Sequence, residues 1–231
     1  MKYSIFHTSH CGSTLLSALL SKSLPSYAEP NWSHKLCNVE DKLLYIEAHQ
    51  PKGSIVKYAS AYCSLMPKLK GKKIFIYNKL YHHLIKHASN QRGLEFQRSI
   101  MLQDLHTRSI KHTYPLGQTV AEKAYLWADR MFHAFDAEDT IFIDCEDLFK
   151  NKHYVLEKIC AFLEITYVRT NIDYHVKIAG LLHKDEPVDL DKIFYIDRIK
   201  RIEPYHPFNK ELLDWCYESY GSKGLVSSFI Y

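Results

Sequence analysis

The segment from Tyr3 to Leu20 constrains the fold of this chain more than any other part of the sequence. An apolar run typical of a strand, Tyr3–Phe6, leads into a short polar loop with one glycine, Gly12, and a helical pattern with leucines on one face follows at once. This order places backbone N–H groups and the hydroxyls of Ser13 and Thr14 at a helix N-terminus, where the helix dipole favours an anion. Gly12 lets the backbone approach a phosphate without a Cβ in the way. We interpret the segment as a phosphate-binding loop.

The loop is not a Walker A motif, because Gly12 and not a lysine precedes Ser13. Without that lysine, chemistry on a γ-phosphate with Mg²⁺ lacks its main cation. The other interpretation is an ordinary strand–turn–helix connection in which Ser13 and Thr14 only cap the helix.

Composition narrows the class of protein. The chain has 231 residues, 46% of them hydrophobic and 24% charged, which suits one soluble α/β domain. A net charge of +4 with 14 histidines suits an anionic ligand and argues against nucleic acid. The apolar runs are too short for a membrane span, and no signal peptide is expected. Six cysteines without a C-x-x-C pair or zinc spacing indicate reduced thiols, no metal site and a cytoplasmic protein.

Short strand-like runs alternate with helical patterns along the chain, and this alternation predicts an α/β fold. The expected strands are Tyr3–Phe6, Ser54–Lys57, Lys73–Tyr77 and Thr140–Ile143. The expected helices are Ser13–Lys22, Ala61–Lys68, Leu80–Ala88, Glu95–Lys111, Val120–Ala134, Tyr154–Leu163 and Lys210–Tyr220. Strands that alternate with helices favour three layers, with a mostly parallel central sheet between helices. We expect one domain over 1–231, in which 166–231 forms a helical subdomain.

Two stretches resemble sulfotransferases. Residues 11–14 match the loop with which that family binds the 5′-phosphosulfate of 3′-phosphoadenosine 5′-phosphosulfate (PAPS); they are Cys11, Gly12, Ser13 and Thr14. His10 stands in the slot of the family's usual Lys or Arg. Further on, Trp127 and Met131, the Glu146-Asp147-Leu148 run and the Phe162-Leu163 run are similar in order and spacing to the family's W-x-x-x-[ML], E-D-L and F-L-G-[IL] motifs. The resemblance covers roughly residues 3–165 and implies a P-loop NTPase-like fold and PAPS as the cofactor.

The resemblance also implies a general base. Tyr27-Ala28-Glu29-Pro30 is similar to the S-E-P segment after the phosphate-loop helix of bacterial-type sulfotransferases, so Glu29 is the expected base, held extended by Pro30. Lys57 ends a strand candidate near the loop, where its charge would stabilise the leaving group, and His10 would do the same if protonated. His7 and His10 are the alternative bases.

The family's element for the 3′-phosphate is only partly present. In the 73–86 segment the arginine slot holds Asn78, which brings no charge, and the serine slot holds Lys86. We expect Lys86, together with Arg92 or Arg98, to supply the missing cation.

The sequence leaves three functions open. The first is a PAPS-dependent sulfotransferase acting on a hydroxyl or amine of a small molecule, lipid or sugar. The second is a P-loop kinase-like protein, for which Asp144 is the candidate Mg²⁺ residue. The third is a non-catalytic protein of the sulfotransferase fold that binds an adenosine phosphate or a partner.

Overall fold

The computed structural model describes residues 1–9, 11–34, 39–80, 83, 119–169, 177–179, 185–189 and 194–196. The helices expected over 95–111 and 210–220 lie outside these residues, as does most of the one expected over 80–88. His10, Lys86, Arg92 and Arg98 also lie outside them.

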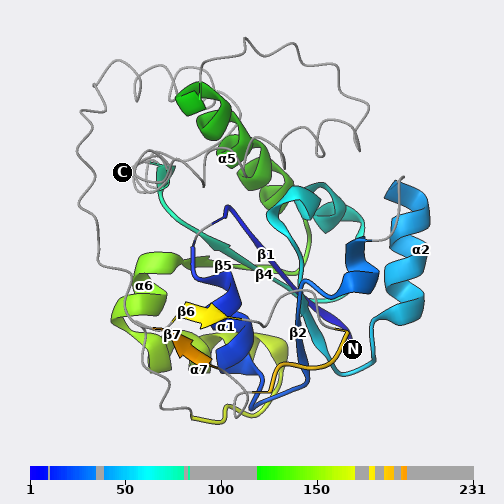
Figure 1. Cartoon of the computed structure of the whole chain (residues 1–231), viewed down its shortest axis with the longest axis vertical. Coiled ribbons are helices and arrows are strands. Elements are labelled where there is room, and N and C mark those ends of the chain that lie inside the picture. The colour runs from blue at the N-terminus through cyan, green and yellow to red at the C-terminus, as the bar shows by residue number, and fades with distance from the viewer. Residues whose placement is uncertain are drawn as a thin grey trace.

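A five-stranded sheet forms the centre of the molecule, with the strand order β2-β3-β1-β4-β5 (Figure 1). Its strands are β1 (Tyr3–His7), β2 (Ser26–Ala28), β3 (Ile55–Lys57), β4 (Lys73–Tyr77) and β5 (Thr140–Asp144). Every neighbouring pair is parallel. Parallel neighbours need crossover connections, which here contain the helices, so the predicted α/β class is confirmed.

Helices cover both faces of the sheet (Figure 1). One apolar cluster holds the side chains of α1 (Ser13–Leu20), α6 (Cys145–Lys150) and α7 (Lys152–Leu163) against the sheet. A second cluster holds those of the 3₁₀ turn η1 (Asn31–His34), α2 (Val39–His49), the 3₁₀ helix η2 (Ser60–Lys68) and α5 (Thr119–Phe135). The three-layer arrangement predicted from the sequence is therefore confirmed.

Side chains alternate between the two clusters along each central strand. In β1, Ile5 belongs to the cluster with α1 and Phe6 to the cluster with α5; in β4, Ile74 and Phe75 divide in the same way. All four are fully buried. Burial of one such side chain contributes roughly 1.5–3 kcal/mol, so the apolar runs that mark these strands in the sequence also hold both helix layers to the sheet.

Several elements are absent from the sequence-based assignment, among them β2, α2 and α6. Strand β2 has only three residues and lies between Pro25 and Pro30, which hides any period-2 pattern. Helix α2 is rich in charge, and α6 spans only six residues directly after β5. The helix expected over 61–68 is a 3₁₀ helix, and it contains Pro67, which has no N–H for an α-helical hydrogen bond.

The described parts of the C-terminal region are short. Strands β6 (Lys177–Ala179) and β7 (Phe194–Ile196) form an antiparallel pair. Between them, residues 185–189 run along the open edge of β2, where the Val188 N–H donates to Ser26 O at 2.6 Å. The helices in the described part of the chain fall short of the length or hydropathy that a bilayer crossing requires.

Candidate functional site

The loop between β1 and α1 has the backbone shape of an anion-binding turn. Ser9 and Gly12 both adopt positive φ angles, of 87° and 81°. Gly12 is the N-cap of α1, and its carbonyl accepts the N–H of Leu16 at 2.9 Å. The N-cap residue Gly12 has no side chain with which to cap α1, and Ser13 and Thr14 are part of the helix rather than caps. A positive φ at a non-glycine residue such as Ser9 costs roughly 1–3 kcal/mol, and such strain concentrates at functional sites.

Gly12 is required here for packing as well as for its φ angle. A Cβ built on Gly12 would lie 3.2 Å from Cζ of Phe149, on α6. The sequence analysis explains this glycine by close approach of a ligand. The structure shows that its open side faces a ring of the protein, so the backbone N–H groups and not the missing Cβ are what the loop offers to a ligand.

The remaining loop side chains differ in exposure. Cys11 is fully buried, and its thiol donates to Ile76 O at 3.2 Å, so its side chain faces the sheet. Ser13 is buried and Thr14 half-buried. Of the four loop residues assigned to cofactor binding, Cys11 therefore has only its main chain to offer.

Three side chains hold the start of the loop. The main-chain N–H of Asn78 donates to Thr8 Oγ1 at 3.1 Å, and its side-chain amide donates to Ser9 O at 3.4 Å. Trp127 Nε1 donates to Asn78 O at 2.7 Å, and Arg130 Nη1 donates to Thr8 O at 2.8 Å. One N–H of the Asn78 amide thus holds the loop, and the 3′-phosphate role expected for Asn78 from the sequence stays a prediction.

Arg130 is a residue that the sequence analysis missed. Its side chain is fully buried, on the face of α5 that packs against the sheet. A signal was present: Arg130 lies three residues after Trp127 and four before Ala134, so it falls on the apolar face of the helix. A charge in such a stripe indicates a buried partner or ligand.

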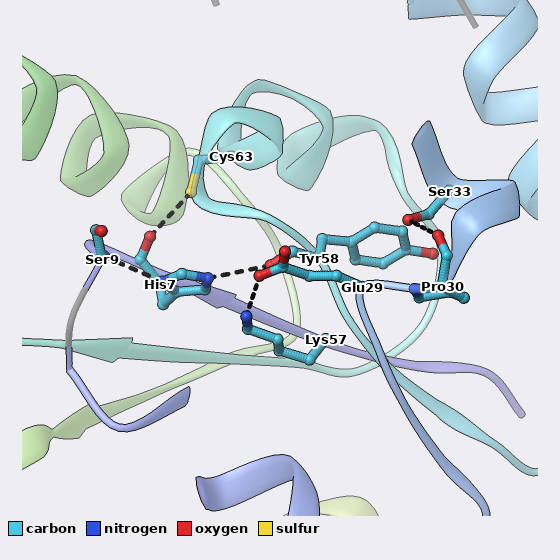
Figure 2. A network of polar contacts seen from close by, with 8 residues as sticks. All are labelled: His7, Ser9, Glu29, Pro30, Ser33, Lys57, Tyr58 and Cys63. Carbon is cyan, nitrogen blue, oxygen red and sulfur yellow. Dashed lines mark hydrogen bonds and ion pairs between the residues drawn. The ribbon is translucent and has the colours of Figure 1, made fainter. Parts of the chain in front are cut away.

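Glu29 and Lys57 form an ion pair at the same edge of the sheet (Figure 2). Ala28 pairs with Lys57 in the β2–β3 register, and the Glu29 N–H donates to Lys57 O at 2.8 Å. The Lys57 ammonium lies against Glu29 Oε1, with side-chain exposures of 3% and 13%. From the sequence, Lys57 is expected on the leaving-group side, apart from the base. The unrecognised strand β2 brings the two residues into contact instead.

The backbone of Glu29 differs from the expectation. Glu29 has φ 49°, in the left-handed region, rather than the extended conformation favoured before a proline. The next turn is pinned on both sides: Ser33 Oγ donates to Pro30 O at 2.7 Å, and the Trp32 N–H donates to Asp185 Oδ1 at 3.1 Å. These bonds secure a strained residue at the edge that carries the loop between β1 and α1.

His7 is fixed as a structural residue. Its Nδ1 accepts the Ser9 N–H at 3.0 Å, so Nε2 carries the proton and donates to Tyr58 O at 3.1 Å (Figure 2). Tyr58 is itself buried, which raises the pKa of its hydroxyl, and that hydroxyl donates to Gln50 Oε1 at 3.2 Å. With both ring nitrogens of His7 engaged, the geometry disfavours it as the alternative base.

The acidic residues at the end of β5 and in the first turn of α6 stabilise the start of that helix. Asp144 is the N-cap of α6, and its Oδ1 accepts the Glu146 N–H at 2.8 Å. Burial, with smaller contributions from Asp147 and Glu146, raises the pKa of Asp144. Burial, together with the charges of Asp144 and Asp147, raises the pKa of Tyr77, at the end of β4, to about 12. Within the described residues, no cluster of three His, Cys, Asp or Glu side chains suits a metal ion.

One comparison with known proteins bears on the fold. No family model matches the chain, and no curated protein matches it in sequence. Among solved structures, a sulfotransferase domain from the curacin biosynthetic pathway matches with a TM-score of 0.54 and 16% identity, over 94% of this chain and 96% of that one.

Two further solved structures match at lower TM-scores. The sulfotransferase domain of the Synechococcus PCC 7002 olefin synthase has a TM-score of 0.46 and 14% identity, over 73% of this chain and 74% of that one. A sulfotransferase from Alicyclobacillus acidocaldarius has a TM-score of 0.42 and 14% identity, over 95% of this chain and 91% of that one. The likeness to the curacin-pathway domain extends over nearly the whole of both chains, so this chain has the P-loop NTPase-like α/β fold of a sulfotransferase domain.

Proposed function

We propose that this protein is a sulfotransferase that transfers a sulfuryl group from PAPS to a hydroxyl or amine of a small-molecule, lipid or sugar acceptor in the cytoplasm. The observation that carries the proposal is a juxtaposition. The loop at the N-terminus of α1 and the Glu29–Lys57 pair lie at the carboxyl edge of the same parallel sheet, on neighbouring strands. Open α/β sheets bind their ligands at this edge.

The loop supplies the anion-binding part of the function. The N–H groups at an uncapped helix N-terminus, beside two residues with positive φ, favour a phosphate or sulfate group. Ser13 and Thr14 add hydroxyl donors in the first turn of α1. In this proposal the loop holds the 5′-phosphosulfate of the donor.

Glu29 supplies the base. The acceptor oxygen attacks sulfur, the bond from sulfur to the 5′-phosphate oxygen breaks with its electron pair, and the acceptor proton passes to the carboxylate of Glu29. Lys57 occupies Oε1, while no described residue donates a hydrogen bond to Oε2, so Oε2 is the oxygen that takes the proton. We assign Lys57 to orienting this carboxylate rather than to the leaving group.

A second candidate function is binding without catalysis. It is favoured by Asn78, whose amide is used inside the protein and brings no charge to the slot where the resemblance places an arginine. Lys86 and Arg92, the expected substitutes, lie outside the described residues. The kinase-like alternative is disfavoured because Asp144, its candidate Mg²⁺ residue, caps α6.

Calorimetric titration of the purified protein tests the donor site. We expect 3′-phosphoadenosine 5′-phosphate (PAP) to bind more tightly than ATP with Mg²⁺. Gly12→Ala forces a Cβ against Phe149 and strains the loop, and loss of one charge-assisted phosphate contact, roughly 1.5–3 kcal/mol, weakens binding by about tenfold or more.

Gly53→Ala is the matched control. Gly53 also has a positive φ, of 73°, but nothing lies within 4 Å of a Cβ built there, and it is in the turn before β3, at the opposite end of the sheet. The Gly53→Ala variant has a similar backbone strain at a site away from the loop, so we expect it to bind PAP with wild-type affinity. Equal affinity of the Gly12→Ala variant and the wild type for PAP would remove the basis of the proposal, as would tighter binding of ATP with Mg²⁺.

A further inference from the structure

Arg130 has more hydrogen-bond donors than the described part of the chain uses. The side chain is fully buried, and among the described residues Nη1 alone has a partner, the carbonyl of Thr8. Nε and Nη2 are buried and have no hydrogen-bond partner among the described residues. Nor does any described carboxylate form an ion pair with it; Asp129, its neighbour in sequence, lies 3.6 Å from His133 instead. A buried cation without a counter-charge is costly, so this one needs an explanation.

A purely structural role does not account for this side chain. Holding the Thr8 carbonyl needs one N–H group, and a neutral side chain can supply one. A guanidinium presents five N–H groups in a plane, and its Nε–Nη2 edge matches two oxygens of a phosphate or sulfate group. That edge is the one without a partner among the described residues.

The position of Arg130 connects this edge to the candidate site. Thr8 directly follows β1 and opens the phosphate-binding loop, and the bond from Nη1 fixes the guanidinium against it. Asn78 contacts both Thr8 and Ser9 from the end of β4, and Trp127, one helical turn before Arg130, donates to Asn78 O. The guanidinium therefore lies at the side of the loop where Asn78 leaves a charge missing.

We propose that Arg130 is an oxyanion ligand of this site, and that its Nε–Nη2 edge binds a phosphate group of the donor nucleotide. The proposal rests on the function proposed above and adds to it the cation that Asn78 does not provide. The same chemistry suits the 3′-phosphate and the 5′-phosphate of PAP. The anion contributes the counter-charge and the two acceptors that the described residues do not supply.

Titration of the wild type and three variants with two nucleotides tests the ligand. Arg130→Gln removes the charge and Arg130→Lys keeps it without the two-pronged edge; Lys150→Gln, an exposed site on α6, controls for net charge. We expect Arg130→Gln to weaken PAP binding by about 10- to 100-fold, the loss of a charge-assisted contact, and Arg130→Lys by less. Lys150→Gln binds as the wild type does.

Adenosine 5′-phosphate, which lacks the 3′-phosphate, separates the two sources of the anion. If Arg130 holds the 3′-phosphate, Arg130→Gln binds this nucleotide as the wild type does; if it holds the 5′-phosphate, both nucleotides lose affinity equally. Either outcome supports the proposal. A folded Arg130→Gln variant with wild-type affinity for PAP would overturn it.

Inorganic sulfate distinguishes failure of this inference from failure of the proposed function. If wild-type protein binds no adenosine nucleotide, the proposed function fails, but sulfate should still raise its melting temperature above that in chloride at equal ionic strength. Arg130→Gln should lose that rise, and no rise in the wild type would count against an oxyanion at Arg130. If neither variant folds, the Nε–H resonance of Arg130 in the wild type decides: it shifts on addition of sulfate or PAP if the proposal holds, and stays in place if it does not.

Discussion

Glu29 combines three features that seldom occur together in one residue. Its φ angle is positive, its carboxylate is paired with a buried lysine, and its side chain remains 13% exposed. An isolated surface glutamate has none of these constraints. The strain at its backbone is maintained by the β2–β3 register and by the pinned turn after Pro30. A carboxylate fixed in direction but reachable from outside has the properties that a general base requires.

Replacing Glu29 by Gln tests this residue. The Gln side chain keeps an oxygen that accepts from Lys57 but removes the counter-charge of that buried ammonium, so we expect a loss of roughly 3–5 kcal/mol in the free energy of unfolding. Release of PAP from PAPS, measured with a panel of hydroxyl acceptors, should fall by about 10²–10⁴-fold, because the acceptor proton loses its base. PAP affinity should remain close to that of the wild type.

The control for this prediction is Glu47→Gln, at an exposed position of α2. It should leave both the free energy of unfolding and the rate of PAP release unchanged. Full turnover in the Glu29→Gln variant would show that another group accepts the proton.

At the scale of elements, the charge of Asp144 at the junction between β5 and α6 lowers the stability of the fold. Asp144 has extended backbone angles, ends β5 and caps α6 through Oδ1. Glu146 and Asp147 follow in the first turn, where the helix dipole favours them, but their charges oppose that of Asp144. Burial and this repulsion raise its pKa, so ionisation of Asp144 near neutral pH reduces stability.

Two substitutions separate the cap from the charge. Asp144→Ala removes the acceptor for the Glu146 N–H, and we expect it to cost about 1 kcal/mol in urea unfolding at pH 7. Asp144→Asn keeps an acceptor oxygen and removes the charge, so it should cost less than the alanine variant or stabilise the protein.

The difference in stability between the wild type and Asp144→Asn depends on pH, in a direction set by the raised pKa of Asp144. Because the pKa of Asp144 is raised in the folded state, the ionisation penalty is complete above that pKa and absent below the ordinary value of the unfolded chain. Wild type should therefore gain stability relative to Asp144→Asn as pH falls through this window. A difference that is constant from pH 7 to pH 3.5 or grows in the other direction would contradict the assignment.

At the scale of the whole molecule, the C-terminal region completes the edge of the sheet that carries Glu29. Residues 185–189 follow the open side of β2, with one main-chain bond from Val188 to Ser26 and one bond from the Trp32 N–H to the Asp185 carboxylate. An edge strand of three residues otherwise exposes unpaired main-chain groups. Part of the support for the candidate site thus comes from a segment more than 150 residues away in sequence from Trp32.

Val188→Pro should weaken this support. Proline has no N–H to donate to Ser26 O, so we expect a loss of about 1 kcal/mol in the free energy of unfolding relative to Val188→Ala, which removes the same side chain and keeps the donor. Urea titration of both variants measures the difference. Equal stability of the two would mean that this bond does not hold the segment to β2.

The sequence by itself determined the elements whose signals are local. Apolar runs marked β1, β3, β4 and β5, the period of 3.6 marked α5 and α7, and the glycine-containing loop marked the start of α1 to the residue. Alternation of these elements was sufficient to predict a parallel sheet between helices, because few other arrangements bury both sets of apolar faces. The position of Lys57 at a strand end was also predictable, but neither the strand before Glu29 nor the contact between the two residues was.

Only the tertiary structure decided which side chains meet. Glu29 and Lys57 are 28 residues apart and touch because β2, too short to show a pattern, pairs with β3. Arg130 reaches Thr8 across 122 residues, and Asn78 reaches Ser9 across 69. Such contacts follow from strand order and helix packing, which the whole chain determines jointly as it buries its apolar surface. A local sequence pattern predicts whether a side chain faces the core or the solvent. Which distant residue that side chain contacts depends on how all the other elements pack.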